Sequence, residues 1–401
     1  MKKIVVVGAS LAGIRACQNL RREGFDGHLT LLGEEQHLPY DRPPLSKTML
    51  TSEQDPLDLN LVSNSDLSDL DLELILGERA TGLNTEQSEV TVGGEKIGYD
   101  GLIIATGARA RKLSKFDHID GIHTLRTVDD ALAIRLGLIS SSSIVIVGAG
   151  FIGSEVAAAA RQRGCKVTIV EANEAPLVRG LGIKVGNACA NLHYSNDIDL
   201  RFGVGVKDVH GSSSIEAVAL TDGTVLPAEL LVVGIGAVPN TEWLAGSGLS
   251  VDDGVVCDET LNAGIRGVYA VGDVARAPNK WLGGQIRRTE HWTTATEHAA
   301  LAAKNLLTPE ESAPYSSVPF IWSDQNDHRI QVAGDTIDFD DVQILSGSVE
   351  EQSFIAGYRH GNSLAGVMAL NNMPRFVKYR RLLAGHSSWQ DVVDLSLELT
   401  T

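Results

Sequence analysis

The chain twice contains an apolar strand that runs into a glycine turn, and this repeat limits the possible folds more than any other feature. Residues 5–13 read VVVGASLAG, and residues 145–153 read VIVGAGFIG. After each turn comes a helix-like stretch and then a second apolar strand, the order of a βαβ unit that binds a dinucleotide. We therefore expect an α/β protein with two Rossmann-like domains.

The first turn departs from the G-x-G-x-x-G pattern. Ser10 occupies the place of the middle glycine, between Gly8 and Gly13. Serine adds only a CH2OH group, which can point away from a phosphate or donate a hydrogen bond to it, so we expect the turn still to bind. Glu34 closes the following strand, where an acid can bind a ribose. The alternative is a βα turn that binds no ligand.

The second turn is intact, with Gly148, Gly150 and Gly153 in the three glycine positions. Glu171 ends the next strand, 18 residues after Gly153. A carboxylate at that point accepts hydrogen bonds from both ribose hydroxyls of NAD and repels the 2′-phosphate of NADP. No lysine or arginine stands at 172–174. The sequence therefore predicts NADH rather than NADPH as the ligand.

Three further stretches are apolar strands that end in glycine turns. They are YDGLIIATGARAR at 99–111, VLPAELLVVGIGAVPN at 225–240 and GVYAVGDVAR at 267–276. Small residues at a strand end let the backbone approach a cofactor closely, and the Asp273 carboxylate can accept hydrogen bonds from a polyol. Each stretch alone is equally typical of a buried strand that binds nothing. The argument for a cofactor site therefore depends on the order of the stretches along the chain.

Charge and hydropathy exclude several classes of protein. A net charge of −17 argues against a nucleic-acid partner, and no apolar run approaches the roughly 20 residues of a membrane-spanning helix. The N-terminal MKKIVVVGAS resembles a signal peptide, but its apolar run stops at the glycine turn, so we interpret it as a first strand. The predicted location is cytoplasmic.

The four cysteines are scattered, at Cys17, Cys165, Cys189 and Cys257. They form no C-x-x-C pair and show no metal-ligand spacing, so neither a metal site nor a disulfide framework is expected. No paired thiol that could carry electrons is visible either.

The order of these motifs resembles that of the two-dinucleotide flavoproteins, the family that includes glutathione reductase, over nearly the whole chain. More narrowly, four short motifs resemble the NADH-dependent, FAD-containing ferredoxin reductases of cytochrome P450 and aromatic-ring dioxygenase systems. These motifs are YDRPPLSK (40–47), LRTVDDA (125–131), EHW (290–292) and FIWSDQ (320–325).

The resemblance implies three domains. Residues 1–108 and 241–310 are expected to bind FAD, residues 109–240 to form an inserted NAD domain, and residues 311–401 to form a C-terminal α+β interface domain. The first turn would hold FAD and the second NADH, so that a hydride can pass between their rings.

The route by which electrons leave follows from a missing pair of cysteines. Disulfide reductases of this superfamily carry a C-x-x-x-x-C pair beside the flavin, whereas the corresponding stretch here, RPPLSKTML, has no cysteine. The flavin is therefore expected to pass single electrons directly to an external carrier.

Three residues are implied to be catalytic. Lys47 would lie near the flavin, paired with Glu155, and stabilise negative charge on the reduced ring. Trp292 would cover the ring edge or the electron exit. The alternatives are that Lys47 is a solvated surface lysine, that Glu155 is only a favourable charge at a helix N-terminus, and that Trp292 is a core tryptophan. Cofactor contacts are expected from Gly8, Ser10, Leu11, Ala12, Gly13, Glu34, Arg42, Lys47, Ala80, Ala105, Thr106, Gly107, Arg126, Gly148, Gly150, Phe151, Ile152, Gly153, Glu155, Glu171, Gly234, Ile235, Gly236, Gly272, Asp273, Glu290, His291 and Trp292.

The implied partner is a 2Fe–2S ferredoxin, which would itself be acidic. Since this chain is acidic too, docking has to use local basic patches. Two runs qualify, 276–288 and 375–381, although both are equally typical of ordinary solvated faces. The cations expected to dock are Arg287 and Arg288 in the first run, and Arg375, Lys378, Arg380 and Arg381 in the second. Monomers and homodimers are both compatible with the sequence.

Two other functions fit the same motifs. A rubredoxin reductase, an NADH oxidase or a monodehydroascorbate-type reductase would share both cofactors and differ in the acceptor. A flavin-bearing redox sensor of the apoptosis-inducing-factor type would use slow reduction to alter its binding rather than turn over rapidly.

Overall fold

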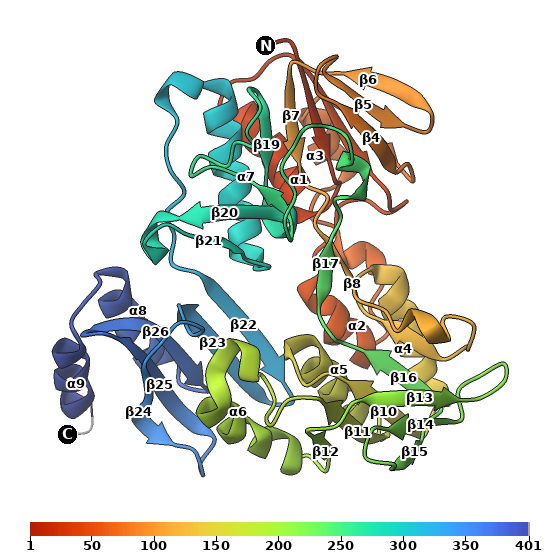
Figure 1. Cartoon of the computed structure of the whole chain (residues 1–401), viewed down its shortest axis with the longest axis vertical. Coiled ribbons are helices and arrows are strands. Elements are labelled where there is room, and N and C mark those ends of the chain that lie inside the picture. Colours follow the sequence, from red (N-terminus) through yellow and green to blue (C-terminus); the bar gives the residue numbers. More distant parts are fainter. Residues whose placement is uncertain (400–401) are drawn as a thin grey trace. The chain divides into compact units, whose positions relative to one another are not determined.

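The computed structural model describes residues 1–399, which form two compact units. The first unit consists of residues 1–41, 57–109 and 237–319, and the second of residues 42–56, 110–236 and the chain from 320 onward. Both units are discontinuous in sequence, because the chain passes from one to the other several times (Figure 1).

The first unit is built on a five-stranded parallel sheet in the order β19–β7–β1–β2–β3. The strands are β1 (Lys3–Val7), β2 (His28–Gly33), β3 (Leu72–Leu76), β7 (Gly101–Ile104) and β19 (Val268–Ala270). The strands β1, β7 and β19 are buried over nearly their whole length, which explains their apolar sequences.

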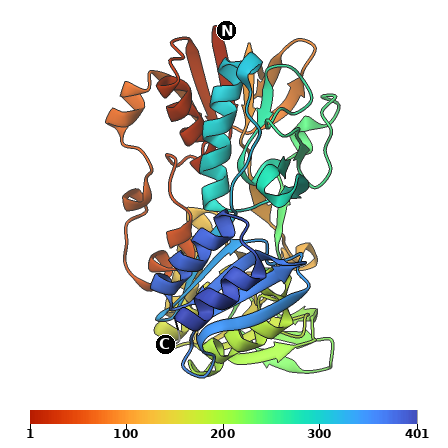
Figure 2. The same cartoon turned by 90° about the vertical axis from the view of Figure 1, so that its left-hand side faces the viewer.

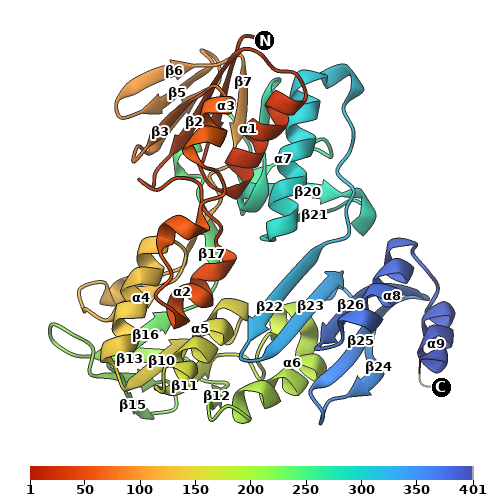
Figure 3. The same ribbon diagram turned by 180° about the vertical axis from the view of Figure 1, so that it is seen from behind.

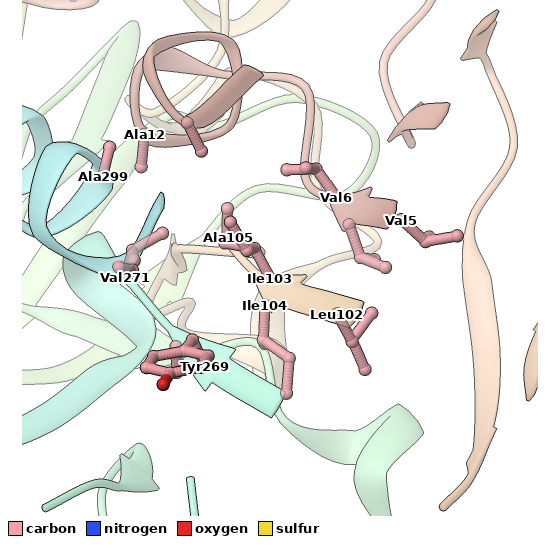
Figure 4. Packing of buried hydrophobic residues seen from close by; sticks show 14 of the residues in the cluster. Val5, Val6, Ala12, Leu102, Ile103, Ile104, Ala105, Tyr269, Val271 and Ala299 are labelled. Atoms are coloured by element: carbon pink, nitrogen blue, oxygen red, sulfur yellow. The ribbon is translucent and has the colours of Figure 1, made fainter. Parts of the chain in front are cut away.

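Two helices of the first unit pack on one another beside this sheet. They are α1 (Leu11–Arg22) and α7 (Trp292–Leu307), which lie side by side in both views (Figure 1 and Figure 3). Figure 4 shows Ala12 of α1 and Ala299 of α7 pointing toward each other near Val271. Small side chains at this contact allow the helices to approach closely at the end of the sheet where the glycine turn lies.

Smaller elements complete the first unit. β4 (Ala80–Asn84), β5 (Glu89–Val92) and β6 (Glu95–Gly98) form an antiparallel sheet, with α3 (Asn64–Asp69) preceding β3. β18 (Val255–Val256), β20 (Ala275–Asn279) and β21 (Gln285–Arg288) form a second small sheet, in which β20 and β21 are antiparallel. The short strands β8 (Ala108–Ala110) and β17 (Ala237–Pro239) pair where the chain crosses between units.

The second unit repeats the Rossmann-like arrangement. Its parallel sheet has the order β12–β11–β10–β16–β9. The strands are β9 (Ile122–Thr124), β10 (Ser143–Val147), β11 (Lys166–Glu171), β12 (Asp199–Phe202) and β16 (Leu230–Val233). The helices are α4 (Val128–Ser140), α5 (Phe151–Gln162) and α6 (Val178–Tyr194), and β13 (Val206–His210), β14 (Ala217–Leu220) and β15 (Val225–Pro227) form an antiparallel sheet.

The C-terminal segment adds an antiparallel sheet in the order β22–β23–β26–β25–β24. The strands are β22 (Phe320–Gln325), β23 (His328–Gly334), β24 (Asp341–Ser348), β25 (Ser353–His360) and β26 (Ser363–Leu370). The helices α8 (Met373–Ala384) and α9 (Trp389–Glu398), dark blue in Figure 2, lie on one face of this sheet. Leu181 and Val185 of α6 share a core with Phe354 and Tyr358, so the sheet packs on the second Rossmann-like domain.

These observations confirm the predicted fold class of two Rossmann-like domains and a C-terminal α+β part. The predicted domain boundaries stay a prediction. Residues 42–56, which include α2 (Thr48–Thr51), pack with α4 and α5 in the second unit rather than with the sheet of the first. Among residues 1–399, no helix is both long enough and apolar enough to cross a membrane.

Candidate functional site

The first glycine turn lies at the end of β1 in the first unit. A Cβ added to Gly8 would lie 2.1 Å from the carbonyl oxygen of Ala105, and one added to Gly13 would lie 1.8 Å from that of Gly8. Both positions therefore require glycine, the first also because its φ is +118°. Ser10 has φ −117° and ψ −162°, an extended backbone that any residue adopts. Serine at position 10 is therefore compatible with the backbone of the turn, and ligand binding by the turn stays a prediction.

The second glycine turn has the same construction in the second unit. A Cβ on Gly148 would lie 2.3 Å from the carbonyl oxygen of Gly234, and one on Gly153 would lie 2.0 Å from that of Gly148. Gly150 differs, because no atom lies within 4 Å of its Cβ position. Gly150 is also the N-cap of α5, where free backbone N–H groups favour an anion. The open space in front of this helix end fits a pyrophosphate.

Glu171 is fixed beside the second turn. One carboxylate oxygen accepts a hydrogen bond from the Ala149 backbone N–H at 2.8 Å. The other accepts from the backbone and side-chain nitrogens of Asn173, at 2.8 Å and 2.5 Å. Since a carboxylate has about four acceptor positions, these bonds orient Glu171 and still leave it able to accept from a ribose. Asn173 is a contributor that the sequence analysis missed.

Two histidines of the first unit feel the charge of Asp273: His298, which is buried, and His291, which is half-buried. Burial lowers the pKa of His291 to about 4 and that of His298 to about 3, against the opposing effect of the Asp273 carboxylate. The Nδ1 atom of His291 has no hydrogen-bond partner among the described residues, and neither ring nitrogen of His298 has one. His291 is the N-cap of α7, so its unsatisfied nitrogen belongs to the residue at the start of that helix, and its predicted contact with the flavin stays a prediction.

The ion pair implied for Lys47 and Glu155 is present. Lys47 Nζ lies 2.8 Å from Oε2 of Glu155, and the Lys47 side chain is 19% exposed against 6% for Glu155. Ser46 Oγ donates to the same oxygen, and Ser323 Oγ donates to the other oxygen at 2.6 Å. Lys47 is therefore not a solvated surface lysine, while its action on a flavin stays a prediction.

The comparisons with known proteins agree with this geometry. The model of the family described as "Pyridine nucleotide-disulphide oxidoreductase" matches residues 2–299, and that described as "Reductase C-terminal" matches residues 320–399. The chain belongs to the pyridine nucleotide-disulphide oxidoreductase family. Rhodocoxin reductase of Rhodococcus erythropolis is 37% identical over 95% of this chain and 89% of its own length. The ferredoxin–NAD(+) reductase component of the p-cumate 2,3-dioxygenase system of Pseudomonas putida is 37% identical over 84% of this chain and 82% of its own.

A solved structure of the same kind superimposes closely on this reductase. The ferredoxin reductase for the CYP199A2 system of Rhodopseudomonas palustris matches with a TM-score of 0.92 at 33% identity, over 97% of this chain and 96% of its own. A chain in the crystal structure of the covalent putidaredoxin reductase–putidaredoxin complex matches with a TM-score of 0.91 at 30% identity. The match covers 96% of this chain and 93% of that chain. The predicted family is thereby confirmed, and its cofactors are FAD and NADH.

The segment that carries Lys47 is anchored in the second unit of the reductase. Arg163 Nε donates to the Leu50 carbonyl at 2.5 Å, and Arg135 donates to the Gln54 carbonyl at 3.1 Å. Arg42 likewise donates to the carbonyl of Arg126. Three residues assigned to FAD by the sequence, Arg42, Lys47 and Arg126, thus belong to the unit that holds the second turn.

Other predicted FAD contacts lie in the first unit, with partners that the sequence did not reveal. Trp292 begins α7, and its Nε1 donates to Asp41 at 2.8 Å. Thr106 Oγ1 donates to the Asn240 carbonyl at 2.8 Å, and Glu34 forms an exposed ion pair with Arg79 at 3.4 Å. Trp292 is half-buried rather than a fully buried core residue. The cofactor roles of these residues stay predictions.

The thiols of the reductase are buried and unpaired within the described chain. Burial raises the pKa of Cys17, Cys189 and Cys257 to about 12, and it also raises that of Cys165. All four cysteines are free. A thiol with such a pKa is a poor nucleophile and a poor redox partner at neutral pH. No group of three or more metal-ligating side chains occurs among residues 1–399.

The two basic runs differ in how their cations are used. Arg288 is 11% exposed and is held by the Asp253 carboxylate at 3.3 Å and by Glu290. In the second run, Arg375 donates to Ser346 and to the Leu399 carbonyl, and Arg380 lies 4.6 Å from the centroid of the Phe320 ring. Lys378 and Arg381, also in the second run, are exposed on α8.

Proposed function

We propose that this reductase takes a hydride from NADH onto FAD and passes single electrons to a 2Fe–2S ferredoxin that feeds a cytochrome P450 or a Rieske-type oxygenase. The observation that carries the proposal is the partly buried ion pair of Lys47 with Glu155, since Glu155 lies one turn into α5, behind an intact dinucleotide turn. Relatives named as ferredoxin–NAD(+) reductase components support the same acceptor.

The residues of the chain divide the work between binding and electrostatics. The turn at 8–13 and Asp273 would hold FAD, and the turn at 148–153 with Glu171 would hold NADH and disfavour a 2′-phosphate. FAD, when bound, supplies the conversion of a two-electron donor to one-electron delivery. Lys47, held by Glu155, places a fixed positive charge that stabilises negative charge on the reduced ring.

The exposed cations of α8 are the better candidates for ferredoxin docking. Arg288 is already neutralised by two carboxylates, so it offers little net charge to an acidic partner. Lys378 and Arg381 stand exposed on the C-terminal helix pair, and we assign the docking patch to them. A monomeric or homodimeric state and a cytoplasmic location stay predictions.

Stopped-flow reduction tests the donor and the acceptor separately. NADH should reduce the bound flavin much faster than NADPH, and the reduced protein should then turn over repeatedly with a 2Fe–2S ferredoxin. A purified chain without flavin would refute the proposal. Turnover with oxygen or rubredoxin, but not with any ferredoxin, would favour an oxidase or a rubredoxin reductase. A flavin that stays reduced in the presence of every acceptor would favour a redox sensor.

Charge reversal on α8 tests the docking patch. Lys378→Glu with Arg381→Glu should raise the ferredoxin KM about threefold to tenfold at low salt and leave ferricyanide reduction unchanged. Lys207→Glu is the matched control, since Lys207 is an exposed residue of β13 in the same unit. Equal losses with ferredoxin and ferricyanide would contradict the assignment.

A further inference from the structure

Glu155 is a buried carboxylate whose two oxygens are bound from different parts of the chain. Ser46 Oγ and Lys47 Nζ both contact Oε2, and they come from the segment that precedes α2. Oε1 receives its hydrogen bond at 2.6 Å from Ser323, which stands on β22 of the C-terminal sheet. All these residues belong to the second unit.

Ser323 is itself held in a fixed orientation. It is 0% exposed and pairs across the sheet with Ile330 of β23. Gln325, two residues along the same strand and also 0% exposed, donates from Nε2 to Ser323 Oγ at 3.2 Å. Because its oxygen accepts from Gln325, the Ser323 hydroxyl proton is directed at Glu155. The result is a buried chain of hydrogen bonds from Gln325 to Ser323 to Glu155.

The hydrogen bond to Oε1 has a consequence for Lys47. A carboxylate removed from water needs donors on both oxygens, and one ion pair on Oε2 would leave Oε1 unsatisfied. With Ser323 on Oε1, the carboxylate plane is fixed and Oε2 faces the ammonium of Lys47. The C-terminal sheet therefore controls the geometry of an ion pair formed by two distant segments.

We propose that Ser323 is a positioning residue that fixes the Lys47 ammonium through Glu155, with Gln325 orienting its hydroxyl. The C-terminal sheet thus contributes to the electrostatics of the redox site and is more than a docking platform. The geometric part stands on the hydrogen bonds alone, and only the effect on flavin rests on the proposed function.

The labelling rate of Lys47 tests the geometric part. The purified full chain is treated with acetic anhydride at several pH values, and acetylation of the Lys47 peptide is followed by mass spectrometry. Ser323→Ala should speed acetylation of Lys47 about threefold to tenfold, because a carboxylate that has lost a donor holds the ammonium less well. Ser323→Thr keeps a hydroxyl and should restore the slow rate.

A matched control and a double variant separate positioning from general damage to the fold. Ser348→Ala removes a serine hydroxyl that donates at 2.7 Å to a carboxylate, that of the exposed Glu350, and should leave Lys47 labelling unchanged. In a Glu155→Gln background, Ser323→Ala should have no further effect on Lys47 if it acts through Glu155. An unchanged rate in Ser323→Ala, or an equal acceleration in the Glu155→Gln background, would overturn the proposal.

The midpoint potential of the bound flavin tests the link to function. If Lys47 stabilises negative charge on the reduced ring, Ser323→Ala should make the potential more negative and Ser323→Thr should restore it. Faster Lys47 labelling with an unchanged potential would overturn the link while leaving the hydrogen-bond chain intact. A chain that bound no flavin would refute the proposed function, and the labelling result would still decide the role of Ser323.

Discussion

Gly150 offers the sharpest test of the second nucleotide turn. The space that a Cβ at this position would occupy is empty in the protein, and it lies where a ligand is expected. Gly150→Ala adds one methyl group to a residue with φ −77° and ψ −177°, a backbone that alanine adopts without strain. No atom lies within 4 Å of the new Cβ. The free energy of unfolding should therefore change by less than about 1 kcal/mol, the range of Gly→Ala effects at compatible sites.

The same methyl group should weaken NADH binding substantially. Overpacking a close contact by one carbon costs about 1–3 kcal/mol. At about 1.4 kcal/mol per tenfold, this corresponds to a rise of about 5- to 150-fold in the Kd for NADH. Flavin content should stay at the wild-type level, because FAD is expected in the other turn.

Two comparison variants complete the assay. Gly153→Ala puts its Cβ 2.0 Å from the Gly148 carbonyl oxygen, so it should disrupt the turn and lower thermal stability as well as binding. Gly205→Ala, whose nearest neighbour is Thr221 Cγ2 at 3.7 Å, should change neither. NADH binding is measured by stopped-flow flavin reduction over a range of NADH concentrations, and stability by urea unfolding. Wild-type NADH affinity in Gly150→Ala would refute the reasoning that places a pyrophosphate in front of α5.

Two further predictions concern Glu171 and His298. Glu171→Gln keeps the shape of the side chain but loses its charge, so the KM for NADH should rise about tenfold. The preference for NADH over NADPH, measured by initial rates, should become smaller. An unchanged preference would contradict the role of Glu171. His298 is buried with a pKa of about 3, so the unfolded state binds a proton below about pH 6.5 while the folded state does not. Stability is therefore lost as the pH falls, by about 1.6 kcal/mol between pH 6.5 and pH 5, because the slope rises from half of about 1.36 kcal/mol per pH unit at pH 6.5 to nearly the full value at pH 5. Urea unfolding of His298→Phe should show a correspondingly smaller loss, and an equal loss in both proteins would rule out His298 as its source.

The Rossmann-like units could be read from the sequence because their causes are local. Gly8, Gly13, Gly148 and Gly153 are required by backbone atoms that the same turn or its neighbouring strand brings within about 2 Å of a Cβ. The buried parallel strands show as unbroken apolar runs for a similar reason, since both their faces are covered. The position of Glu171 follows from the length of the βαβ unit.

Other features depend on segments that meet only after folding. Ser323 donates to Glu155 across 168 residues of sequence, and the segment 42–56 packs with the second unit although it lies within the sequence range of the first. Likewise, the charge of Arg288 is neutralised by Asp253, 35 residues away, and the sequence of the run that carries Arg288 does not reveal this pairing. A buried charge takes whatever donors or counter-charges the packing brings to it, and no spacing along the chain encodes that choice. The sequence by itself determined the two nucleotide turns and the fold around them, whereas only the tertiary structure decided which side chains hold the Lys47–Glu155 pair in place.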